Sequence, residues 1–127
     1  MRLKIGLIED SRFEFHKWEL LADLSDHSCE VIWYKEPQTF LRRVNKDKVD
    51  FLVVDRSLYS KGKKIDIVTS GFMHKIREVY PGPIVYCSDI AAFKDEKHFF
   101  QKSIPGKVIK SIDKLINDLE LSDAKYN

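Results

Sequence analysis

A run of four apolar residues near the middle of the chain constrains the fold more than any other feature. Residues 51–54 (Phe-Leu-Val-Val) are too few for a core helix, two of them are β-branched, and the flanking residues are polar. Such a run is typical of a strand that is buried on both faces, as the central strands of parallel sheets are. Asp55 follows the run directly, so we expect its carboxylate at the carboxyl end of this strand.

Four further short apolar runs alternate with segments that have the spacing of amphipathic helices. The expected strands cover 3–8, 29–34, 84–87 and 99–101, and the expected helices begin near Ser11, at Pro37, between Ile65 and Ser70, near Ala91 and after Gly106. This alternation predicts a three-layer α/β fold with a doubly wound, five-stranded parallel sheet of strand order 2-1-3-4-5. The fourth helix and the fifth strand must be short, because only thirteen residues separate Ser88 from Lys102.

Two expectations concern local packing. In the first helix we expect Phe13, Leu20, Leu21 and Leu24 on one apolar face, with Trp18 at its border. After Asp55, the polar residues 59–64 (Tyr-Ser-Lys-Gly-Lys-Lys) are expected to form a loop.

Composition excludes several classes of protein. With 127 residues, 43% of them hydrophobic and 33% charged, we expect one globular domain over residues 1–121 and a frayed tail over 122–127. No apolar run approaches the ~20 residues that span a bilayer, so we expect a cytoplasmic protein without membrane contacts. A net charge of +2 is too small to indicate a nucleic-acid partner. Cys29 and Cys87 are expected on non-adjacent strands, too far apart for a disulfide.

Polar side chains follow the expected strands at one edge of the sheet. Glu9 and Asp10 follow the first strand and Asp55 the third, which are neighbours in the predicted order, so their carboxylates should converge. Their repulsion is relieved by raised pKa values or by a bound cation, and Mg²⁺ is the ion that suits such oxygen ligands. Ser88 and Lys102, at the ends of the fourth and fifth strands, would bring a hydroxyl and a positive charge. Together these groups are the parts that phosphoryl transfer to Asp55 needs.

In this order and on these elements, the five residues resemble the receiver domain (CheY-like) of bacterial two-component response regulators, over about residues 3–121. The resemblance implies that Asp55 accepts a phosphoryl group from a sensor histidine kinase or a phosphotransfer protein. It implies that Ser88 and Lys102 hold this group. A receiver is a signalling switch and not an enzyme in the usual sense, so its output would be contact with a downstream protein.

The resemblance also implies a metal site and a switch pair. The Mg²⁺ site would consist of the carboxylates of Asp10 and Asp55, the carboxylate of Glu9 acting partly through water, and the backbone carbonyl of Ser57. Phe99 stands where receivers keep an aromatic residue whose rotamer follows phosphorylation together with Ser88, although it is also a plausible plain core residue. The oligomeric state implied is a monomer or a weak homodimer.

Several departures from the family leave alternatives open. Tyr59 and Ser103 stand where receivers usually have proline, and the segment between Ser88 and Lys102 is short. The stretch between Asp55 and Ser88 is long, and we assign the excess to the loop at 61–64. A pseudo-receiver, which keeps the fold for protein contacts without phosphotransfer, is one alternative. A small Mg²⁺-dependent phosphatase or nuclease is another. Nucleic-acid binding through the lysines at 61–64 is weaker, since Tyr59 is the only interleaved aromatic residue.

Overall fold

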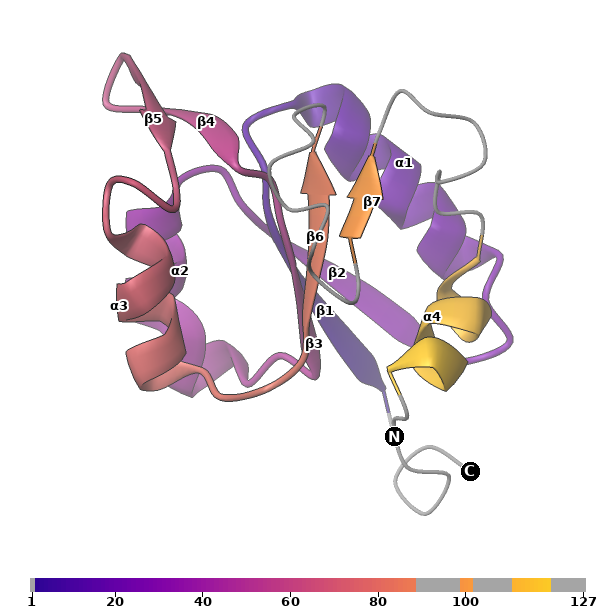
Figure 1. Cartoon of the computed structure of the whole chain (residues 1–127). Helices are drawn as coiled ribbons and strands as arrows, with labels where there is room; N and C mark the ends of the chain where they lie inside the picture. The colour runs from indigo at the N-terminus through magenta and orange to yellow at the C-terminus, as the bar shows by residue number, and fades with distance from the viewer. Residues whose placement is uncertain (1, 89–98, 102–110, 120–127) are drawn as a thin grey trace.

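The computed structural model describes residues 2–88, 99–101 and 111–119. Its elements in chain order are β1 (Leu3–Ile8), α1 (Arg12–Asp23), β2 (Cys29–Tyr34), α2 (Pro37–Asp47), β3 (Phe51–Val54), β4 (Ser57–Ser60), β5 (Lys63–Asp66), α3 (Phe72–Val79), β6 (Ile84–Ser88), β7 (Phe99–Gln101) and α4 (Ile112–Asp118) (Figure 1). The helix expected near Ala91 and the tail at 122–127 lie outside the described residues. None of the helices in the described ranges is long and apolar enough to cross a membrane.

Five parallel strands form one sheet in the order β2-β1-β3-β6-β7, which is the predicted order 2-1-3-4-5. Ile8 at the end of β1 stands opposite both Tyr34 and Val54, so the strands end nearly level and their carboxyl ends share one edge. Cys29 on β2 and Cys87 on β6 are both free thiols, as predicted.

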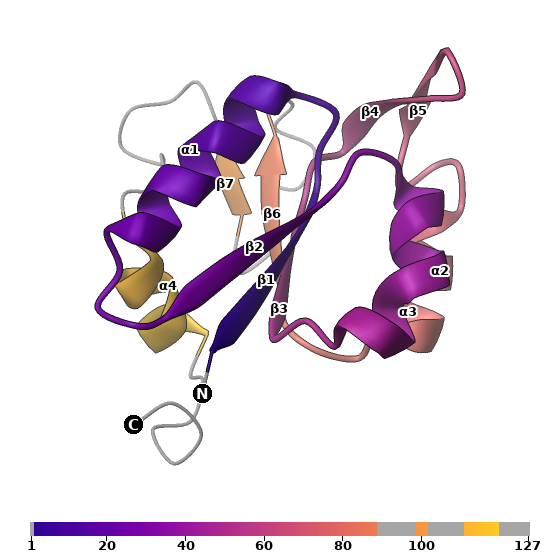
Figure 2. The ribbon, with the colours of Figure 1, turned by 180° about the vertical axis from the view of Figure 1, so that it is seen from behind.

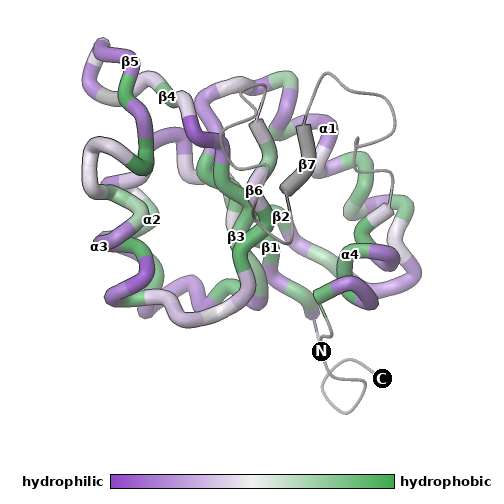
Figure 3. Tube along the Cα trace, in the orientation of Figure 1, coloured by the Kyte–Doolittle hydropathy of each residue, from purple (hydrophilic) through white to green (hydrophobic). Residues whose placement is uncertain are grey.

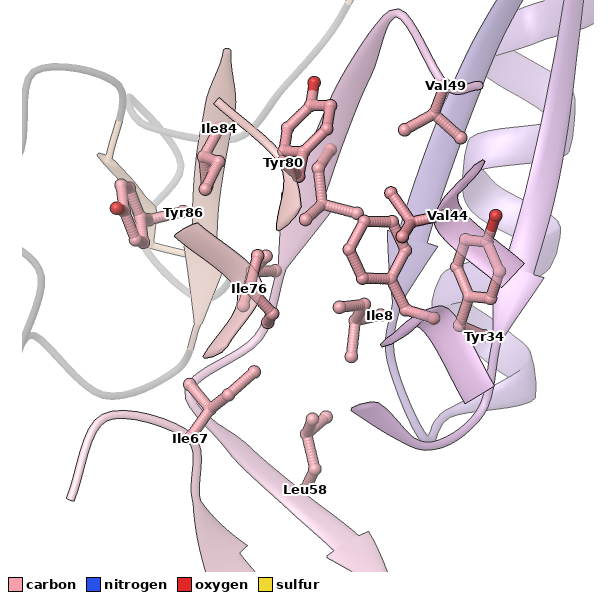
Figure 4. Packing of buried hydrophobic residues seen from close by; sticks show 13 residues of the cluster. Ile8, Tyr34, Val44, Val49, Leu58, Ile67, Ile76, Tyr80, Ile84 and Tyr86 are labelled. Atoms are coloured by element: carbon pink, nitrogen blue, oxygen red, sulfur yellow. The ribbon is translucent and has the colours of Figure 1, made fainter. Parts of the chain in front are cut away.

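The sheet separates two apolar cores, and alternate residues of each central strand supply them. In β3, Leu52 and Val54 face the core with α2 and α3, while Phe51 and Val53 face the core with α1 and α4. Figures 1 and 2 show the two helix pairs on opposite faces, Figure 3 shows the apolar central strands, and Figure 4 shows the packing on the α2 side. Each of the four β3 side chains is at most 1% exposed, which confirms that this strand is buried on both faces.

Helix α1 packs on a different face from the one predicted. Trp18, expected at the border, is 1% exposed and lies in the core, and the Phe15 ring stacks on Trp33 of β2 with centroids 4.7 Å apart. The apolar residues left in solvent are Phe13 (77% exposed), Leu20 (59%) and Leu24 (71%). Only Leu21 of the predicted face packs against the core. Positions 15, 18 and 22 also have helical spacing, and this stripe carries the largest side chain.

The predicted loop after Asp55 is a β-hairpin, so that prediction was wrong. β4 and β5 pair antiparallel as a separate two-stranded sheet, and the turn residues Lys61 and Gly62 have φ angles of 53° and 77°. Two successive positive φ angles match the turn type that fits the twist of a hairpin. Leu58 is fully buried in the core of α2 and α3, and Arg56 Nε donates to Asp66 Oδ2 at 2.6 Å at the hairpin base. Burial of Leu58 therefore holds a segment whose local sequence is mostly polar.

Candidate functional site

Three carboxylates meet at the carboxyl edge of the sheet. Glu9 and Asp10 follow β1, Asp55 follows the neighbouring β3, and one carboxylate oxygen from each lies within 4.8 Å of the other two. Glu9 is 2% exposed and Asp55 is 7% exposed, while Asp10 is half-buried. The strand order thus brings together the three carboxylates that the sequence indicated, and their chemical roles remain predictions.

The sheet fixes the backbone of these acids. The Asp55 N–H donates to the Ile8 carbonyl and the Glu9 N–H donates to the Tyr34 carbonyl, both at 3.2 Å, so the parallel ladder continues past the strand ends. Trp33 Nε1 donates to the Glu9 carbonyl from β2. Because these hydrogen bonds continue the pattern of the sheet, they fix the backbone positions of Glu9 and Asp55.

Each of the three carboxylates accepts a backbone N–H. Glu9 Oε1 accepts from Ser11 at 3.2 Å, Asp10 Oδ2 from Tyr59 at 3.0 Å and Asp55 Oδ1 from Ser57 at 3.4 Å. These N–H groups direct partial positive charge at the acids and offset part of their mutual repulsion.

The acids that follow β1 do not cap helix α1, although capping would be their ordinary structural role. Ser11 is the N-cap of α1, and its hydroxyl accepts from the Glu14 N–H at 3.4 Å. Capping of α1 therefore does not require either Glu9 or Asp10, although the Ser11 N–H does bond to Glu9. Asp10 instead bonds to Tyr59, which lies 49 positions later in the chain.

The remaining predicted residues are described to different extents. Ser88 is the last residue of β6, next to β3, and is fully buried opposite Gln101 of β7. Ser57 begins β4, directly beyond Asp55 and Arg56. Phe99 begins β7, whose backbone forms the predicted fifth strand. Lys102 lies outside the described residues.

The donor set fits a divalent cation of the hard type. Three like charges within 4.8 Å repel each other, and a bound cation removes that repulsion. All three donors are carboxylate oxygens, the ligands that Mg²⁺ and Ca²⁺ prefer over imidazole or thiolate. Asp10, the most exposed of the three, leaves the cluster open to solvent on its side.

Sequence reasoning missed a fourth carboxylate near this edge. Glu36 is the N-cap residue of α2, yet its side chain makes no cap bond, and Oε1 accepts from the Lys61 N–H of the hairpin at 2.8 Å. The signal was present, because Glu36 is the second residue after β2, as Asp10 is the second residue after β1. Pro37 at the first helical position favours a helix-capping role for residue 36, which Glu36 does not fill.

This arrangement of strands, helices and strand-end acids defines a class of fold: the chain has the fold of response-regulator receiver domains. It is similar to the signal receiver domain of a modulated diguanylate cyclase from Desulfovibrio desulfuricans G20, with TM-score 0.66, 15% identity, and 96% of this chain and 94% of that chain covered. It is also similar to a two component transcriptional regulator AraC from Clostridium phytofermentans ISDg, with TM-score 0.65, 13% identity, and 93% and 92% covered.

A further similar structure is the bacteriophytochrome response regulator AtBRR, with TM-score 0.65, 14% identity, and 96% of this chain and 95% of that chain covered. No protein-family model matches the sequence, and no curated protein matches it. At these identities the likeness is one of fold, and the function has to be argued from the site.

Proposed function

We propose that residues 1–121 form a receiver domain that accepts a phosphoryl group on Asp55 in the presence of Mg²⁺ and thereby switches a protein-interaction surface. The observation that carries the proposal is the position of Asp55. It directly follows the central strand β3, it is 7% exposed, and its carboxylate lies within 4.8 Å of those of Glu9 and Asp10. The fold supports the proposal, because solved receiver structures share it.

The proposed chemistry is an in-line displacement at phosphorus. A carboxylate oxygen of Asp55 forms the new P–O bond while the P–N bond of a phosphohistidine breaks, and the leaving imidazole nitrogen keeps the electron pair. Glu9, Asp10, Asp55 and the Ser57 carbonyl would hold Mg²⁺, which would offset the negative charge of the phosphoryl oxygens. The donor would be a sensor histidine kinase or a phosphotransfer protein.

Ser88 and Lys102 complete the proposed set. The Ser88 hydroxyl would donate to the phosphoryl group, and this role is supported by the position of Ser88 at the end of β6, the strand next to β3. The roles of Lys102 as the paired cation and of Phe99 as a switch residue rest on the resemblance of the sequence. The output would be a changed affinity for a downstream protein, with the chain itself a monomer or weak homodimer.

A pseudo-receiver is the second candidate, and one contact favours it. The Tyr59 N–H bonds to Asp10 Oδ2, which places the hairpin against a proposed metal ligand. If this contact is permanent, the acids serve to hold the hairpin, and the fold acts as an interaction module without phosphotransfer.

Intact-protein mass spectrometry separates the candidates. After incubation with Mg²⁺ and acetyl phosphate, we expect wild type to gain one phosphoryl group, and we expect no gain with EDTA or in Asp55→Asn. Asp23→Asn, at an exposed acid of α1, is the matched control and should be labelled like wild type. No gain under conditions that label an ordinary receiver would favour the pseudo-receiver. Hydrolysis of a generic phosphate ester that is lost in Asp10→Ala would indicate a phosphatase instead.

A further inference from the structure

The outer edge of β4 runs along the acidic end of the main sheet. Successive N–H groups of a strand point to opposite edges, and every second one here is bonded away from β5. The N–H groups of residues 57 and 59 of β4 donate to Asp55 Oδ1 at 3.4 Å and Asp10 Oδ2 at 3.0 Å. The N–H of the turn residue Lys61 donates to Glu36 Oε1 at 2.8 Å. The β4 edge and the adjoining turn are thus bonded to carboxylates that follow β3, β1 and β2.

The rest of the hairpin is held mainly at its base, where the Arg56–Asp66 ion pair closes it. Leu58 is buried and Ile65 is half-buried, and they anchor one face. Tyr59 on the opposite face is 56% exposed, and the lysines at 61, 63 and 64 are all exposed. In Figure 1 the hairpin projects beyond the carboxyl edge of the sheet. Its position therefore depends on its apolar base and on the three bonds to carboxylates.

We infer that cation binding at Glu9, Asp10 and Asp55 and docking of the hairpin through the Tyr59 N–H oppose each other. Ser57, whose carbonyl is a proposed ligand, lies at the base of β4 and stays at the site, so that only the strand beyond it is released. In this scheme Tyr59 is a positioning residue, which acts on the site through its backbone N–H and the Asp10 carboxylate. The inference rests on the cation site of the proposed function, and it makes the hairpin an element that responds to site occupancy.

The direction of the coupling follows from charge. A divalent cation at the Asp10 carboxylate withdraws electron density from the oxygen that accepts the Tyr59 N–H, and it repels the positive end of that N–H dipole. Each interaction therefore weakens the other. Because linkage is reciprocal, removal of the N–H must strengthen cation binding by the factor by which the cation weakens docking. The bond between Lys61 and Glu36 involves no member of the cation site and should persist.

Amide hydrogen exchange, measured by NMR on the ¹⁵N-labelled full chain, tests the inference in wild type. On saturation with Mg²⁺ alone, we expect the Tyr59 amide to exchange several-fold faster. The Leu58 amide, on the other edge of β4, should keep its rate. A Tyr59 rate that is unchanged or slower in the Mg²⁺-saturated protein would overturn the inference while leaving the cation site intact.

Calorimetric titration with Mg²⁺ tests the reciprocal effect. Tyr59→Pro deletes the N–H at an edge position where proline is tolerated, and Tyr59→Ala is the matched control because it removes the ring but keeps the N–H. We expect Tyr59→Pro to bind Mg²⁺ about fivefold more tightly or better, and Tyr59→Ala to bind like wild type. Equal affinity in all three proteins would overturn the inference alone. Absence of binding in all three would overturn both the inference and the proposed cation site.

Discussion

Asp47, at the end of α2, illustrates how the surroundings of a single buried acid set its protonation. Its side chain accepts from the Tyr34 hydroxyl at 2.6 Å and from Arg43 Nε at 3.1 Å, and the residue is 7% exposed. Burial acts to raise the pKa of this carboxyl, but the hydrogen bonds from Arg43 and Tyr34 outweigh it and hold the pKa below its ordinary value of 3.8. Burial and the same hydrogen bond raise the pKa of the Tyr34 phenol.

This network predicts a pH-dependent stability difference. A lowered carboxyl pKa stabilises the fold fully above the unfolded value of about 3.8, and the contribution is lost as the pH falls through the lower folded value. We expect Asp47→Asn to be about 1–3 kcal/mol less stable than wild type at pH 7, and the gap to narrow below pH 4. Urea unfolding at pH 7 and pH 3 measures the difference in free energy of unfolding between the variant and wild type at each pH. Tyr34→Phe, which removes one hydrogen bond to Asp47 but keeps the carboxylate, should give a stability between those of Asp47→Asn and wild type. An equal gap at the two pH values would show that the carboxylate charge contributes nothing.

At the scale of elements, α1 shows why an apolar pattern does not fix a packing face. The helix offers two stripes with helical spacing, and the one that carries Phe15 and Trp18 is buried. Burial of an indole ring removes far more apolar surface from water than burial of a leucine, so the aromatic stripe is favoured wherever the core has room for it.

The choice of face predicts a contrast between two aromatic truncations in the same helix. Trp18→Ala should cost about 3–5 kcal/mol, because it leaves a cavity in the core shared with α4. Phe13→Ala, at a position that is 77% exposed, should change the free energy of unfolding by no more than about 0.5 kcal/mol. Urea unfolding monitored by circular dichroism measures both. Similar costs for the two variants would contradict the described packing of α1.

At the scale of the whole molecule, the sheet separates a stable body from an electrostatically strained edge. Both cores are closed by helix pairs, whereas three carboxylates crowd the carboxyl edge. Such repulsion lowers the stability of the metal-free protein, and a bound cation would restore it. In the proposed cation site, stability would thus be exchanged for binding, as is common at functional positions.

The crowding of carboxylates at this edge predicts that Asp10→Asn affects stability differently without and with Mg²⁺. Asp10→Asn relieves repulsion and keeps an oxygen for the Tyr59 N–H, so without Mg²⁺ we expect a higher Tm than wild type. With Mg²⁺ at ten times its Kd, wild type should gain about 1.4 kcal/mol and Asp10→Asn nothing. Thermal unfolding in EDTA and in Mg²⁺ measures this, with Asp23→Asn as control. A lower Tm for Asp10→Asn in EDTA would identify Asp10 as a purely structural acid.

The sequence by itself determined the frame of the protein. Short apolar runs predicted the strands of the main sheet, and Pro37 predicted the start of α2. Their alternation predicted the parallel order, since crossover handedness and short connections leave few topologies. Glu9, Asp10 and Asp55 then had to meet, because residues that end neighbouring parallel strands lie at one edge. These features depend on local pattern and connectivity, which a sequence contains.

Only the tertiary structure decided which of several local possibilities was used. In the tertiary structure the aromatic stripe of α1 is the buried one, and residues 57–66 form a hairpin. Glu36 and the Tyr59 N–H lie at the acidic edge. In each case the local sequence was compatible with more than one arrangement. The choice was made by contacts between residues distant in the chain, such as burial of Leu58 in the core and the bond from Tyr59 to Asp10, and no local pattern records such contacts.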